Sequence, residues 1–165
     1  MRVSFSLAAL LLSYAAGVSA ACNLETGLAP FEMAAGVRPA DAMPDALEAP
    51  KVKVVSITRG VGGAPGSCDG TGILVLDLKA SGGDYKLSEL GFEFRVVATD
   101  SPYAVFPAEP VAITTGKRRS ELLFMWSDDA PAAQKPLVME VEVRAVTRGY
   151  LRGPPARFTV DSRER

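Results

Sequence analysis

The fold is decided by a stretch that reads LVMEVEVRA and spans residues 137–145. Every second residue in it is apolar: Leu137, Met139, Val141, Val143 and Ala145. Three of the four residues between them are charged. Successive side chains of a β-strand point to opposite faces, so this period of two predicts a strand with one face against a core and the other in water.

The same alternation recurs in shorter segments on both sides of this stretch. We expect further strands over residues 52–57, 73–78, 92–96, 103–113, 121–126 and 157–160. The segment 103–113 contains Pro107 and Pro110, and because proline cannot donate to a strand ladder, this segment belongs at a sheet edge. A change of phase between Val54 and Val55 predicts either a β-bulge or a switch from one sheet to the other.

This series of strands, separated by turn-rich loops and without a convincing amphipathic helix, predicts the fold class. We expect an all-β fold, an antiparallel two-sheet sandwich of about seven strands that spans residues 51–162. In such a sandwich the first, second and fifth strands share one sheet, and the third, sixth and seventh share the other.

The outer faces of the two expected sheets differ. If Leu74, Leu76, Phe124 and Trp126 point inward, the outward residues of the first sheet are Ile73, Val75, Leu123 and Met125. This set is a possible interaction patch, because monomers rarely leave a large apolar patch bare. We expect it to be covered by the chain's own segment 23–49, which carries Leu28, Phe31, Met33 and Leu47, or by a second protein. The outward residues of the other sheet predict an ordinary solvated surface: Glu93, Arg95, Glu140, Glu142, Arg144 and Arg157.

The end of the chain resembles a known domain family. The stretch VEVRAVTRGY at 141–150, Gly153-Pro154-Pro155 and the strand at 158–160 resemble the last two strands of a fibronectin type III or related immunoglobulin-like domain. The resemblance implies an immunoglobulin-like sandwich. The tryptophan and the tyrosine that such domains usually carry in an early and in the penultimate strand are absent, so the resemblance assigns no functional residue.

Residues 1–20 have the three zones of a secretory signal peptide. Arg2 supplies a positive start, residues 7–16 are apolar, and Val18, Ser19 and Ala20 are small residues ahead of a cleavage point after Ala20. The apolar stretch is shorter than the roughly 20 residues that span a bilayer. We therefore expect export to the periplasm, the cell envelope or the extracellular space.

Residues 21–50 form a proline-rich segment between the signal peptide and the sandwich. Proline removes a backbone donor and disfavours helix in the residue before it, and four prolines fall in this segment: Pro30, Pro39, Pro44 and Pro50. The segment is therefore expected to be extended, with no regular element of useful length.

The chain contains two cysteines, Cys22 and Cys68. In an exported protein they most simply form one disulfide bond. The alternative is a lipidated Cys22, which would attach the protein to a membrane. A bacterial lipobox carries a large aliphatic residue three positions before the cysteine, where this chain has Ser19.

Composition excludes several function classes. The 18 basic and 19 acidic residues nearly balance, which argues against a nucleic-acid partner. The sequence has no histidine, which excludes Ser-His and Cys-His nucleophiles and histidine-ligated zinc or haem. Asp128 and Asp129 are predicted to be solvated loop residues, with calcium binding as a weak alternative.

We therefore expect no catalytic, cofactor-binding or metal-binding residue, and a protein that is not an enzyme. The expected function is that of a non-catalytic exported module that acts in the cell envelope by binding or structural support. Its partner would be an envelope protein or a surface ligand. The alternative is a surface-anchored lipoprotein with a ligand-binding role.

One mass measurement tests the expected processing. The full sequence is expressed in a bacterial host, and the recovered protein is denatured without reduction and treated with a thiol alkylator. We expect a chain that begins at Ala21 or Cys22 and takes up no alkylator until it is reduced. A diacylglycerol adduct on Cys22 would support the lipoprotein instead, and uptake of two alkyl groups before reduction would contradict the disulfide.

Overall fold

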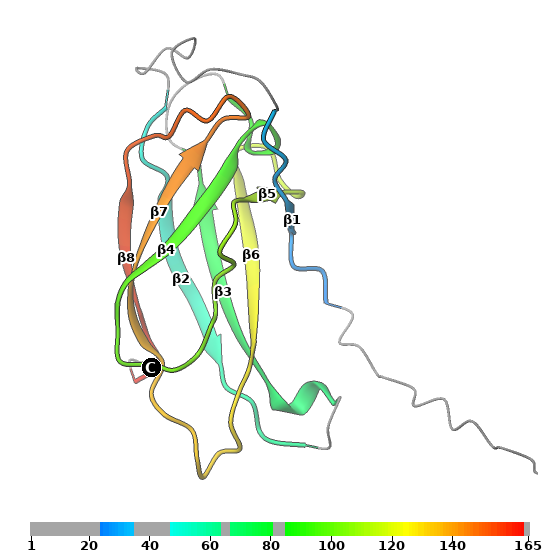
Figure 1. Ribbon diagram of the computed structural model, residues 1–165. Helices are drawn as coiled ribbons and strands as arrows, with labels where there is room; N and C mark the ends of the chain where they lie inside the picture. The colour runs from blue at the N-terminus through cyan, green and yellow to red at the C-terminus, as the bar shows by residue number, and fades with distance from the viewer. Residues whose placement is uncertain (1–23, 35–46, 64–66, 81–84, 164–165) are drawn as a thin grey trace, which may run out of the picture.

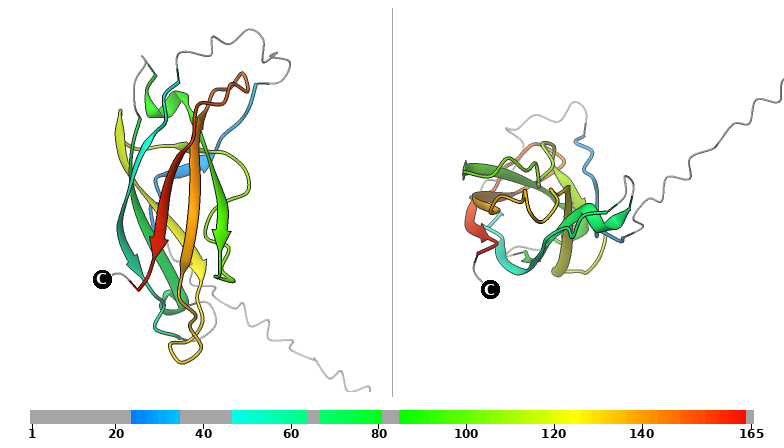
Figure 2. Two further views of the ribbon diagram at one scale, coloured as in Figure 1. Left: turned by 90° about the vertical axis from the view of Figure 1, so that its left-hand side faces the viewer. Right: turned by 90° about the horizontal axis from the view of Figure 1, so that it is seen from below.

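The computed structural model describes residues 24–34, 47–63, 67–80 and 85–163. Two antiparallel sheets face each other in it, as Figures 1 and 2 show. The five-stranded sheet has the order β1 (Leu28–Pro30), β5 (Val111–Ile113), β4 (Gly91–Thr99), β7 (Val138–Val146) and β8 (Ala156–Asp161). The three-stranded sheet has the order β2 (Lys51–Thr58), β3 (Thr71–Lys79) and β6 (Arg119–Ser127). Two short 3-10 turns, η3 (Cys68–Gly70) and η4 (Leu87–Glu89), precede β3 and β4.

The prediction of an all-β antiparallel two-sheet sandwich is confirmed, and so is the division of the main strands. The first, second and fifth expected strands are β2, β3 and β6, and the third, sixth and seventh are β4, β7 and β8. The change of phase in the first strand is a β-bulge and not a switch of sheets. The register of β2 with β3 shifts between Val54 and Ser56.

The structure differs from the prediction in the strand that lies beside β4. The segment 103–113 contributes only Val111–Ile113, after both prolines, because neither proline can donate a ladder hydrogen bond. This strand is not at the edge, since β1 pairs with it on its other side. The segment 21–50, expected to be extended without a regular element, thus supplies a short edge strand.

The core lies between the sheets and follows the predicted alternation. In β3, Leu74, Leu76 and Leu78 have no exposed surface, and in β7 the same holds for Val141 and Val143. Three aromatic rings meet beside these rows: the centroid of the partly buried Phe106 ring lies 5.3 Å from that of Phe94, on which it stacks, and 4.9 Å from that of Phe124. Fully burying a side chain of this size contributes about 1.5–3 kcal/mol, so these rows supply most of the driving force for folding.

At the lower end of the three-stranded sheet in Figure 1, a tryptophan requires a glycine opposite it. Trp126 pairs with Gly72 across β6 and β3, and its indole ring lies where a Cβ atom of residue 72 would project. Gly70, two residues earlier, has nothing within 4 Å of the corresponding position.

We expect Gly72→Ala to lower the free energy of unfolding by about 1–3 kcal/mol, because the added methyl group forces the buried indole ring to move. Gly70→Ala is the matched control and should change stability by about 0.5 kcal/mol or less. Urea denaturation followed by tryptophan fluorescence measures both. Equal stabilities of the two variants would contradict the packing described.

Candidate functional site

The outer face of the three-stranded sheet carries four apolar residues in two rows. Ile73 is the direct partner of Met125, and Val75 of Leu123. All four side chains are half-buried and lie on the side of the sheet opposite the core. We call these four residues the apolar face. On the neighbouring strand the bulged residue Val55, which is 48% exposed, adds apolar surface that the sequence pattern alone did not assign to the patch.

The apolar face is not covered in the way the sequence suggested. Figures 1 and 2 show no described element on the outer side of β2, β3 and β6. Phe31 instead packs on Gly91 of the five-stranded sheet, with the Arg148 guanidinium 5.4 Å above its ring. Leu47 enters the main core beside Gly153. For these two residues of segment 23–49, the predicted covering role is therefore wrong.

The outer face of the five-stranded sheet has the opposite character. Glu142 on β7 accepts hydrogen bonds from Arg157 at 2.7 and 3.0 Å, and Arg152 forms an ion pair with Glu93 at 2.7 Å. The hydrogen bonds from Arg157 keep the pKa of Glu142 below its ordinary value. The predicted charged surface is present there, with several of its charges in ion pairs and Glu142 itself largely buried.

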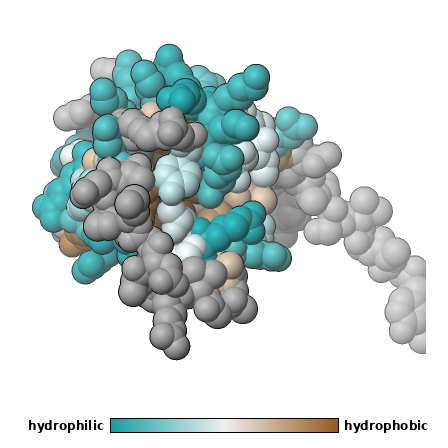
Figure 3. Space-filling view, turned by 90° about the horizontal axis from the view of Figure 1, so that it is seen from above, coloured by the Kyte–Doolittle hydropathy of each residue, from teal (hydrophilic) through white to brown (hydrophobic). Residues whose placement is uncertain are grey.

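Charge changes along the strands of the three-stranded sheet. At the upper end in Figure 1, strand pairing aligns Lys51, Lys79 and Arg119 across β2, β3 and β6; we call these the basic row. Figure 3 looks onto this end and shows hydrophilic residues over much of its visible surface. At the other end, Asp69 and Asp129 are exposed just beyond the ends of β3 and β6; we call these the acidic end. The apolar face lies between the two.

A shallow groove of about 720 Å³ continues the apolar face around the free edge of β6. Leu123 and Met125 form one side of it, and Leu28 and Phe106 belong to the others. The Leu123 amide donates a 3.0 Å hydrogen bond to the carbonyl of Thr26, so the segment before β1 touches the edge of β6 at this point. The groove volume lies within the range of ligand sites, and its lining is mostly apolar, with Glu109 as its ionisable side chain.

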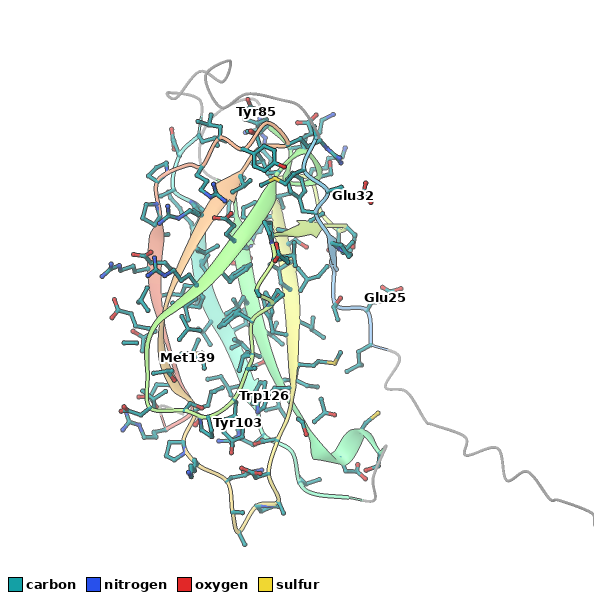
Figure 4. All side chains as sticks on the ribbon, in the orientation of Figure 1. Glu25, Glu32, Tyr85, Tyr103, Trp126 and Met139 are labelled. Atoms are coloured by element: carbon teal, nitrogen blue, oxygen red, sulfur yellow. The ribbon has the colours of Figure 1, made fainter. Side chains whose placement is uncertain are left out.

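A buried ion pair organises the loops at the lower end of the molecule. Arg59 donates two 2.7 Å hydrogen bonds to the carboxylate of Asp128, whose side chain has no exposed surface. The Gly60 amide donates to the same carboxylate at 2.9 Å. Arg59 also lies over the ring of Tyr103, which stands near Trp126, as Figure 4 shows. The sequence-based interpretation of Asp128 as a solvated residue is wrong.

These contacts determine the charge of Asp128. Burial by itself raises the pKa of a carboxyl group, but the hydrogen bonds from Arg59 and Gly60 and the Arg59 charge outweigh burial here. The pKa of Asp128 therefore lies below its ordinary value, and the residue is ionised at neutral pH. Asp129 accepts a hydrogen bond from the Tyr103 hydroxyl at 2.9 Å and remains exposed. The arrangement ties three loops together and holds its charged groups in bonds with one another, which suits a structural role.

The remaining predicted residue pair is Cys22 and Cys68. Cys68 begins η3 at the surface, close to the acidic end. Cys22 lies outside the described residues, so the disulfide stays a prediction. Within the described residues no group of three or more acidic or cysteine side chains is arranged to hold a metal ion. In the same part of the chain, no helix has the length and apolar character to cross a membrane.

Comparison of the chain with protein-family models, with curated proteins and with solved structures finds no match in any of the three.

We expect Asp128→Asn to destabilise the protein by about 3 kcal/mol at neutral pH, the lower end for a broken buried ion pair, because Arg59 keeps some access to solvent. The folded-state pKa lies below the unfolded value of about 3.9, so ionised Asp128 stabilises the fold above that pH. This contribution is lost as the pH falls through the folded-state pKa, and the variant should lack that part of the acid dependence.

Urea titrations at neutral and acidic pH measure both effects. Asp129→Asn, one position along, removes the charge of an exposed carboxylate that accepts one hydrogen bond and should cost about 1 kcal/mol or less. Equal losses in the two variants at neutral pH would contradict the role given to the ion pair.

Proposed function

We propose that this protein is a non-catalytic exported module that acts in the cell envelope by binding a protein surface through its apolar face. The observation that carries the proposal is the contrast between the two outer faces. The five-stranded sheet turns paired charges to solvent, whereas the three-stranded sheet presents Ile73, Val75, Leu123 and Met125. A sandwich core needs only the inner residues of each strand, so the outer apolar rows call for a separate explanation.

The absence of histidine from the whole sequence supports a binding role over a catalytic one. The charged side chains at the lower end, which would be the natural place for chemistry, bond to one another and to backbone groups. The strand order supports a fibronectin type III-like or immunoglobulin-like identity for the sandwich. In such domains the first, second and fifth strands share a sheet, and here β2, β3 and β6 do so.

The proposal includes the Cys22–Cys68 disulfide. The Leu123 amide of β6 holds the carbonyl of Thr26. Cys22 precedes Thr26 by the same number of residues as Ser127 follows Leu123. Ser127 pairs with Thr71, which directly follows the turn that begins at Cys68. The chain is thus long enough to bring the two cysteines together at the end of β3. Closing a loop of this length would stabilise the fold by on the order of 4 kcal/mol.

A capture experiment with matched variants tests the binding function. The mature protein is immobilised and incubated with envelope extract of its native host, and retained proteins are identified by mass spectrometry. We expect at least one protein, which could be a second copy of this chain, to be retained by the native protein and lost with Val75→Lys. The control is Val96→Lys, the same change at a valine of the five-stranded sheet that is 38% exposed.

Both valines are at least partly exposed, so each substitution should cost about 1 kcal/mol or less in stability. Circular dichroism and thermal unfolding verify that both variants are folded. A set of retained proteins that is unchanged by Val75→Lys would contradict binding through the apolar face.

A further inference from the structure

The outer face of the three-stranded sheet runs along its strands from a charged region of net positive charge, through apolar surface, to the acidic end. Strand register gives four levels across β2, β3 and β6. They are Lys51–Lys79–Arg119, Lys53–Asp77–Glu121, Ser56–Val75–Leu123 and Thr58–Ile73–Met125. A fifth level, at Thr71 and Ser127, is followed by the acidic end, Asp69 and Asp129. Above the apolar levels, Arg119 forms an ion pair with Asp77 at 2.6 Å, and the four basic side chains of the two upper levels outnumber Asp77 and Glu121. The charge above the apolar levels is therefore net positive, and the charge below them is negative.

The geometry points to a second copy of this chain as the partner of the apolar face. The two copies would pack face to face about a two-fold axis that lies between the sheets and runs across the strands. Such an axis reverses the strand direction, so that Val75 of one copy faces Ile73 of the other, and Leu123 faces Met125. This inference rests on the proposed binding function and names its partner.

Charge selects this arrangement from the alternatives. When the two apolar levels face each other in reversed order, the basic row of one copy lies opposite the acidic end of the other. Lys79 of one copy then lies on the side of Asp69 of the other. A two-fold axis along the strands would instead place basic row on basic row, which is repulsive. The contact surface of a symmetric dimer must be complementary to itself. In charge, this face is complementary to itself only when the strands of the two copies run in opposite directions.

The size of the face determines how strong the dimer can be. Three strands about 4.8 Å apart and four levels about 6.8 Å apart cover roughly 400 Å² per copy. A standard specific interface buries about 800 Å² per partner. The dimer is therefore weak, and its population depends on protein concentration within the range that purified protein reaches.

Analytical ultracentrifugation of the purified chain, expressed from the full sequence, tests the inference over about a hundredfold range of concentration. We expect a monomer at the low end and a dimer at the high end. Val75→Lys should weaken dimerisation at least tenfold, because it places a charge at the centre of the interface, whereas Val96→Lys should leave it unchanged.

A charge exchange then tests the antiparallel register. Lys79→Glu and Asp69→Lys each place like charges opposite each other and should each weaken the dimer severalfold. The double variant restores opposite charges and should recover most of the native affinity. Both residues lie at the surface, so the recovery cannot be attributed to repaired folding.

Three results would overturn the inference. They are a native chain that stays monomeric at all concentrations, a dimer that Val75→Lys does not weaken, and a double variant no better than the two single variants. A monomeric native chain whose apolar face still captures a different envelope protein would overturn the dimer and leave the proposed binding function standing.

Discussion

The structure depends on the burial of one face of β3 and β6 and on the register that this burial fixes. A shift of one residue in either strand would turn Leu74 or Phe124 into water and bring an outer residue into the core. The inner rows alone therefore determine the pairing, and the outer residues are free to be polar without loss of the fold. The five-stranded sheet uses that freedom for glutamate and arginine. The two middle levels of the three-stranded sheet do not use it, and the proposed binding function accounts for their apolar residues, which the fold does not require.

The two sheets are joined differently at their two ends. At one end Arg59, which follows β2 and pairs with Asp128 of the same sheet, also donates hydrogen bonds to the Tyr103 hydroxyl, between β4 and β5, and to the Lys135 carbonyl, just before β7. Along the edge of β6, residues 26–30 form backbone hydrogen bonds with both sheets. Their partners are Leu123 of β6 in one sheet and β5 in the other. This stretch is thus part of the sandwich although its sequence predicted a linker. Its contacts are with the edge of β6 and with the five-stranded sheet, which leaves the outer face of β3 open.

Local sequence predicted the parts of the structure that depend on periodicity. The alternation in the longer strands was sufficient to find them and to assign their inner and outer sides, including the apolar face. A strand as short as β1, which ends in a proline, has no period to detect. The Arg59–Asp128 pair joins residues far apart in the chain, and the position of Phe31 depends on the missing side chain of Gly91. The basic row likewise becomes visible only when register aligns its three strands.

The edges of the three-stranded sheet bear on how its open face can be used. A free strand edge is a hazard, because its unpaired backbone groups can template pairing with another chain. Here the β2 edge carries Lys51, Lys53 and the bulge at Val55, all of which discourage strand addition. On the β6 edge the Leu123 amide is already bonded to Thr26. With both edges protected in this way, the proposed association through the apolar face would use side-chain packing between sheets, where shape and charge can be selective, and would not lead to open-ended pairing of backbones.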